Sequence, residues 1–219
     1  MNYIYNFPIS MLRDFMKYTD NTLDNILDFC IWQTYKQCKD IDTTKETLGI
    51  SIGSNVDDVL RNGKGLYNRH ADNGYPWTGI SHDLFWSYMR KGRSGFDKAC
   101  LLAFLAIKSL IGQKPYYKLT NQSILFKRMA GYKESDNIKL PKEIAYFTTR
   151  YRFDKIKLEL KENWNIVIYA SYMRGMYLST SLTLDELALQ AEKNKLRTRR
   201  MMQTRATAEA RKKALAALK

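Results

Sequence analysis

The sequence predicts a mainly α-helical fold with one β-hairpin, and four stretches lead to this prediction. Apolar residues recur at helical spacing in Thr22–Gln37, and the run Phe96–Ile111 is apolar nearly all round. The stretch Asn163–Ser181 alternates on both sides of an Arg-Gly pair, which is typical of a hairpin. From Thr183 onward the chain is rich in Ala, Leu, Lys and Arg and contains no Pro or Gly, which favours a basic C-terminal helix.

The N-terminal region is predicted to be helical with an irregular middle. Ile9–Tyr18 is a short candidate helix, and we expect it to pack against Thr22–Gln37 as a helical hairpin. Between Asp40 and Gly79 the composition changes to Gly, Asn, Asp, Thr and Ser. We therefore expect irregular structure there, with at most one or two helical turns in Val56–Tyr67.

Two helices follow before the middle of the chain. The first is the short segment Asp83–Arg90. The second is Phe96–Ile111, where Ser94 and Asp97 resemble a capping box and Gly112 stands at the position of a C-terminal glycine. Because this second helix is apolar on nearly all sides, we expect it at the centre of the core.

The next segment is predicted to hold one strand and two or three helices. Tyr116–Thr120 has the length of a short strand, and Gln122–Met129 is predicted to be a helix. A polar insert, Lys133–Lys142, then leads to one helix, or to a short helix followed by a longer one, that continues through Glu162.

Residues 96–181 thus read helix, strand, helix, helix, strand, strand, which is the element order of a winged-helix domain. The segments TNQSILFKRMAGY and TTRYRFDKIKLELKENW resemble the second helix and the recognition helix of such domains. The resemblance is to the winged-helix domains of plasmid and phage replication initiators and related regulators. It implies a winged-helix domain at 94–181. With the patterns above, we expect a helical N-terminal region with an irregular middle at 1–93 and a basic C-terminal helix at 182–219. The insert departs from this pattern, because a compact domain has fewer residues between the two helices.

The net charge of +14 is concentrated in two segments. Residues 114–174 carry 13 Lys and Arg against 6 Asp and Glu, and residues 193–219 carry 10 against 1. Residues 1–113, with 13 against 12, are nearly neutral. Such a distribution indicates a surface that neutralises phosphates, and a solvated basic face without a partner is the alternative.

The proposed recognition helix presents the main candidate contacts to DNA. If Phe153, Ile156 and Leu160 point into the core, the opposite face of the helix is available. Arg can read guanine edges, Thr can contact phosphate or a thymine methyl group, and Tyr can reach phosphate. The candidate residues are Thr148, Thr149, Arg150, Tyr151, Arg152 and Lys155. An exposed face without a ligand remains the alternative.

A second apolar stripe conflicts with this simple picture. Ile144, Phe147, Tyr151 and Leu158 lie nearly opposite the first stripe if the helix is continuous. Either the N-terminal region packs on this stripe, or the helix breaks near Tyr146.

Other cations are candidates for backbone contacts. Two end the second helix, one stands at the hairpin turn, and the rest lie in the tail. They are Lys127, Arg128, Arg174, Arg197, Arg199, Arg200 and Arg205. Solvation alone is the alternative for the first two, and the tail could instead insert between subunits through its leucines and methionines.

The hairpin itself is expected to close the core. Val167 and Tyr169 fall on one face of its first strand, and Ile166 and Ile168 fall on the other. Since neither face is fully polar, we expect both faces to be covered and only the tip to be offered outward.

Signatures of catalysis and metal binding are missing from the sequence. The motif NGKG around Lys64 lacks the Ser or Thr of a phosphate-binding loop. His70 and His82 have no cysteine at metal-ligand spacing, which argues against a structural zinc. Three unpaired cysteines suit a reducing compartment, and neither an export signal nor a membrane span is visible.

We therefore expect a non-enzymatic, cofactor-free DNA-binding protein of a phage or plasmid, acting in replication initiation or transcriptional regulation. Its expected partners are DNA and a second copy of the chain or another viral or replication protein, with no membrane. The expected location is the cytoplasm of a bacterial host, or the virion. The alternative function is a virion or assembly protein whose basic tail contacts nucleic acid or neighbouring subunits. A third possibility is binding of single-stranded RNA through the many tyrosines.

Overall fold

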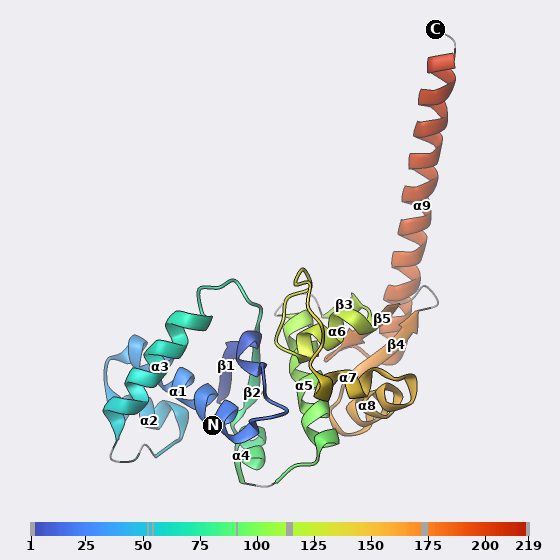
Figure 1. The fold of residues 1–219 in the computed structure, drawn as a ribbon. Helices are drawn as coiled ribbons and strands as arrows, with labels where there is room; N and C mark the ends of the chain where they lie inside the picture. The colour runs from blue at the N-terminus through green and yellow to red at the C-terminus, as the bar shows by residue number, and fades with distance from the viewer. Residues whose placement is uncertain are drawn as a thin grey trace.

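The structure is a computed structural model that describes residues 3–51, 53, 55–90, 92–112, 116–171 and 175–217. It confirms a mainly helical fold with two small antiparallel sheets (Figure 1). The elements in chain order are β1 (Ile4–Pro8), η1 (Ile9–Leu12), α1 (Thr19–Cys38), α2 (Ile41–Leu48), α3 (Val56–His70), β2 (Trp77–Ser81), α4 (His82–Arg90), α5 (Gly95–Ile111), β3 (Tyr117–Thr120), α6 (Gln122–Met129), α7 (Lys142–Ala145), η2 (Tyr146–Thr148), α8 (Arg150–Asn163), β4 (Val167–Ser171), β5 (Gly175–Ser179) and α9 (Leu184–Ala217).

The N-terminal region contains a two-stranded sheet that the sequence analysis did not foresee. β1 and β2 pair antiparallel, with Tyr5 opposite Ile80. The predicted helix Ile9–Tyr18 is wrong: only the 3-10 turn η1 forms. Asp14, at φ 63°, adopts a left-handed conformation that an α-helix does not accommodate. α1 therefore has no helical partner before it and packs on α3 instead.

The prediction of irregular structure between Asp40 and Gly79 is also wrong, because the helices α2 and α3 lie in this segment. The Asp40 side chain caps α2 by accepting from the Thr43 backbone amide, and Gly49 ends the helix in a left-handed conformation. α3 contains Gly63 and Gly65, which lower its intrinsic helix propensity. Packing against α1 outweighs that cost, so tertiary contacts determine this helix.

α5 lies at the centre of the core, as predicted (Figure 1). Ser94 and Asp97 form the predicted capping box at its start, and Gly112 caps its end. The N-terminal region docks on it through β2, where the Thr78 hydroxyl donates to the Leu105 carbonyl at 2.7 Å. One continuous cluster of buried side chains runs from Tyr5 to Leu178, so the core is not interrupted near residue 93. The predicted boundary between an N-terminal region at 1–93 and a domain at 94–181 therefore stays a prediction.

The second half of the chain builds a three-stranded sheet in the order β3-β5-β4, with α6 and α8 beside α5. The predicted strand before α6, the hairpin and the long final helix are all present. Between α6 and α8 the chain forms α7 and η2 and then turns at the extended Thr149. The helix therefore breaks near Tyr146, which was one of the two alternatives drawn from the second apolar stripe.

α9 covers the outer face of this sheet and then extends beyond the rest of the molecule (Figure 1). Leu187 and Ala191 pack on Tyr177, with Val167 and Tyr169 beside them. The opposite face of the hairpin contributes buried Met176 and Leu178 to the main core. Both faces are thus covered, as predicted.

Candidate nucleic-acid interface

The position of α8 is determined by one buried stripe. Phe153, Ile156 and Leu160 are buried, as the helical spacing predicted, and the ring of Phe153 lies 5.3 Å from that of Phe126 on α6. At the start of the helix, the Gln122 side chain donates to the Thr148 carbonyl at 2.6 Å. These contacts hold the N-terminal end of α8 against the first turn of α6.

The face opposite that stripe is open to solvent. The Arg150 side chain is 97% exposed, and Tyr151 is 69% exposed. The Lys155 ammonium lies 4.6 Å from the Tyr151 ring centroid. Its hydrogen bond and its charge lower the pKa of the Tyr151 phenol. Arg150, Tyr151 and Lys155 therefore form an exposed face with a net positive charge on the N-terminal half of the helix, and the Asp154 carboxylate lies 3.9 Å from Arg150 on the same face.

Arg152 behaves differently from Arg150. Its guanidinium carbon lies 3.4 Å from the centroid of the Tyr146 ring, and its Nη1 donates to the Tyr146 carbonyl at 2.9 Å. Sequence reasoning missed Tyr146 as a partner, because the η2 turn that brings it under Arg152 has no clear signal in the sequence. Arg152 is thus held at the start of the helix, and part of its donor capacity is used within the chain.

The two predicted threonines also differ. The Thr148 hydroxyl donates to the Ala145 carbonyl at 2.7 Å, so it closes a local turn. Thr149 is exposed, and its side chain accepts no capping hydrogen bond from a backbone amide in the described part of the helix. Of these two threonines, Thr149 is therefore the one that presents a hydroxyl beside the exposed face of α8.

Lys127 and Arg128, predicted as phosphate contacts, are not free on the surface: Lys127 is bonded within the chain, and the Nε and Nη1 of Arg128 are buried without a hydrogen-bond partner among the described residues. The Lys127 ammonium donates to the carbonyls of Glu134 and Asp136 at 2.9 and 2.8 Å, which closes the loop after α6. Arg128 is half-buried, and burial lowers the pKa of its guanidinium. We therefore leave both residues out of the candidate interface. Arg174, which was predicted to contact DNA from the hairpin turn, lies outside the described residues.

The distal part of α9 forms a second cationic surface, which we call the basic arm and define as residues 193–212. Its last described hydrogen bond to the body runs from the Asn194 amide to the Tyr117 hydroxyl, at 3.2 Å. The arm holds eight Lys and Arg against one Glu. They include all four predicted tail arginines, which are exposed: Arg197, Arg199, Arg200 and Arg205.

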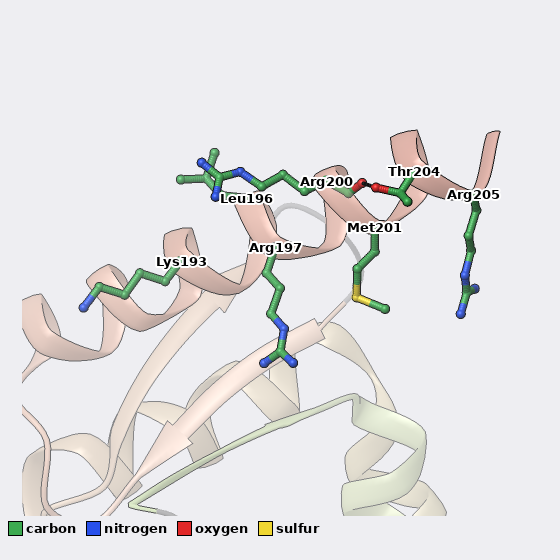
Figure 2. Close-up of a pocket in the computed structure, with 7 residues that line it drawn as sticks. All are labelled: Lys193, Leu196, Arg197, Arg200, Met201, Thr204 and Arg205. Carbon is green, nitrogen blue, oxygen red and sulfur yellow. Dashed lines mark hydrogen bonds between the residues drawn. The ribbon is translucent and has the colours of Figure 1, made fainter. Parts of the chain in front are cut away.

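The side chains of the basic arm surround the helix. A shallow hollow of about 540 Å³ is bounded by α9 side chains alone. In Figure 2, Arg197, Met201 and Arg205 point to one side of the helix, and Leu196 and Arg200 point to another. The arm therefore offers cations in several directions and no enclosed pocket for a small ligand.

Comparison with protein families, with curated proteins and with solved structures gives no match for this chain. Within the described residues, no three His, Cys, Asp or Glu side chains lie together in a way that could hold a metal ion. None of the described helices combines the length and the apolar character needed to cross a bilayer.

Proposed function

We propose that this chain is a non-enzymatic DNA-binding protein that docks duplex DNA against the N-terminal half of α8. The observation that carries the proposal is the exposed cationic face formed by Arg150, Tyr151 and Lys155. An α-helix with its side chains is about as wide as the major groove of B-DNA, so the side chains of such a face can reach base edges and phosphates.

The order of the elements supports a more specific proposal, a winged-helix domain. α5, β3, α6 and α8 are followed by the β4–β5 hairpin, and β3 pairs with β5 at the edge of the sheet. In this proposal α8 is the recognition helix and the hairpin is the wing. The insert after α6 is a local elaboration, which Lys127 closes.

The basic arm supports a second contact that does not depend on sequence. The arm carries eight cations and one acidic residue, so its positive charge is not balanced within the segment. Cations on a projecting helix neutralise phosphates and release counterions, which strengthens binding to all nucleic acids alike. The sequence resemblance to plasmid and phage proteins suggests the setting, so we propose a role in replication initiation or transcriptional regulation of a mobile element.

A second candidate is a virion or assembly protein. The observation that favours it is the half-exposed set of apolar side chains on the basic arm: Leu196, Met201 and Met202. A protein partner would bury these side chains, whereas phosphate contacts would not. In this alternative the arm docks on a neighbouring subunit or on packaged nucleic acid.

Fluorescence anisotropy with labelled duplex and single-stranded DNA, at two salt concentrations, tests the proposal. We expect the double variant Arg150→Ala and Lys155→Ala to lower duplex affinity by about tenfold or more. The matched control is Lys161→Ala, which removes an exposed cation from the C-terminal end of the same helix and should change affinity little.

The possible results separate the proposals. If the double variant binds duplex DNA as tightly as the parent, α8 is not the interface. If the parent binds neither form of DNA at low salt, DNA binding is wrong and the assembly alternative remains. Tighter binding of the single strand than of the duplex would contradict the docking of a major groove.

A further inference from the structure

A hollow of about 280 Å³ lies between the C-terminal end of α5 and the C-terminal end of α8. It is formed by the C-terminal end of α5, the turn between α8 and β4, and the residue after β5. None of the residues proposed to contact DNA lines it. It lies at the C-terminal end of α8, about 20 Å along that helix from Arg150, since an α-helix rises about 1.5 Å per residue. It is therefore a separate site.

The floor of this hollow is aromatic. The rings of Phe104 and Trp164 lie 4.9 Å apart at an angle of 47°. The Trp164 ring is held in place because its Nε1 donates to the Glu159 carboxylate at 3.3 Å. Ile166 adds an aliphatic surface beside the two rings. The floor is thus a fixed apolar surface against which a flat ring can pack.

The turn on the rim is conformationally constrained. Asn165 adopts φ 51°, a left-handed conformation that is uncommon for a residue other than glycine. The hydrogen bond from the Ile166 amide to the Leu160 carbonyl, at 3.0 Å, closes the turn. Asn165 and Thr180, both polar, line the hollow from two different segments. Asparagine is one of the residues that adopt this conformation just after the end of a helix, so the turn fixes the position of Asn165 beside the hollow.

The remaining polar group is a lysine without a counter-ion. Lys108 lines the hollow, and its ammonium lies 5.4 Å from the Phe104 ring centroid. Among the described residues, no carboxylate lies within ion-pair distance of it. Residues 113–115, which are not described, contain no acid. Burial alone lowers the pKa of Lys108, whereas a nearby carboxylate would raise it.

We propose that this hollow binds a small aromatic carboxylate, whose ring packs on Phe104 and Trp164 and whose carboxylate pairs with Lys108. A single ammonium balances one negative charge, so a monoanion fits better than a phosphate monoester with two charges. The hollow lies just below the size range of ordinary ligand pockets, so it suits a small ligand with a single ring. The ligand carboxylate would also offset part of the free-energy cost of removing the Lys108 ammonium from water.

Titration of the full-length chain with benzoate, followed by tryptophan fluorescence, tests this proposal. Benzamide supplies the ring without the charge, and acetate supplies the charge without the ring. We expect saturable binding of benzoate in the millimolar range or tighter, because a ligand of this size has few atoms to contribute. Both partial ligands should bind at least about tenfold more weakly.

Variants assign the binding to the hollow. Lys108→Met keeps the apolar stem and should weaken benzoate binding at least about tenfold while leaving benzamide unchanged. Trp164→Phe should remove most of the fluorescence response. Lys118→Met, at an exposed lysine on β3 outside the hollow, should leave benzoate binding unchanged.

Three results would overturn the proposal. The first is no saturable response to benzoate. The second is equal binding of benzoate and benzamide by the unmodified chain, which does not depend on the folding of any variant. The third is adenosine monophosphate binding more tightly than benzoate, which would indicate a nucleotide site instead.

Discussion

Arg150 and Arg152 stand two positions apart and have different surroundings. Arg150 is almost fully exposed, and its nearest carboxylate, on Asp154, lies 3.9 Å away. Arg152 is stacked on Tyr146 and bonded to its carbonyl. The sequence predicts the same role for both arginines, because residue type and helical position do not reveal a partner supplied by a preceding turn.

This difference predicts different effects on stability. Arg152→Ala should lower the free energy of unfolding by about 0.5–2 kcal/mol, since it removes a cation–π contact and a hydrogen bond. Arg150→Ala should change it by less than about 0.5 kcal/mol, because an exposed ion pair contributes little. Urea unfolding followed by circular dichroism measures both. Equal effects of the two substitutions would contradict the assignment of Arg152 to the fold.

His70 gives a prediction about pH. Its Nδ1 lies 2.9 Å from the Ser10 hydroxyl, and burial together with Arg69 and Arg13 lowers its pKa below the ordinary 6.5. The unfolded chain therefore binds more protons than the folded chain between the folded pKa and 6.5. Stability should fall as the pH is lowered through this window.

The test is the unfolding free energy at several pH values between 7 and 5. We expect His70→Asn, which keeps a polar group beside Ser10 but cannot titrate there, to show a shallower decline than the parent. Parallel curves for the two proteins would show that His70 does not contribute to the pH dependence.

Elements with strong local signals were predicted correctly. α5 has a capping box, an apolar surface and a terminal glycine, and the β4–β5 hairpin has alternation around a turn. The exposed face of α8 could be predicted because it lies opposite the stripe of buried residues on the same helix. These signals all lie within a few turns of chain, so the sequence alone reveals them.

Elements that depend on distant partners were missed. β1 and β2 pair across more than 60 intervening residues, and neither strand has a turn signal that links it to the other. α3 contains two glycines, and its helical state depends on packing against α1. The positions of Lys127 and Arg152 were missed for the same reason, since loop and turn carbonyls decide them.

The glycines of α3 allow a matched test of this explanation. A Cβ on Gly63 would collide with the Asp28 carbonyl and lie 2.8 Å from the Trp32 Cβ on α1, whereas a Cβ on Gly65 meets nothing within 4 Å. Gly63→Ala should therefore destabilise the protein by about 1–3 kcal/mol, because the two helices must separate. Gly65→Ala should stabilise it by up to about 1 kcal/mol through helix propensity. Thermal unfolding of both variants compares them directly, and destabilisation by both would contradict this packing.

At the scale of the whole molecule, α9 has two parts with different physical roles. Its first turns cover the outer face of the sheet through Leu187 and Ala191. Beyond Asn194 the described part of the basic arm forms no hydrogen bond or ion pair with the body, and the arm carries most of the charge of the tail. A helix of this kind is stabilised at its base by packing and at its distal end only by propensity and by a partner.

Truncation after residue 192 should therefore separate stability from binding. We expect the truncated chain to keep the midpoint of thermal unfolding within a few degrees, because Leu187 and Ala191 are retained. Leu187→Asp in the full-length chain should lower that midpoint clearly, since it places a charge against Tyr177 on the covered face of the sheet.

Binding to duplex DNA, unlike thermal stability, should depend on the basic arm. Removal of the basic arm should lower affinity for all duplex sequences alike and reduce the slope of log affinity against log salt by about 2–4, at about 0.9 for each phosphate that the arm neutralises. A truncated chain with an unchanged salt slope would show that the arm does not bind phosphates. The exposed Leu196, Met201 and Met202 would then indicate a protein partner for it.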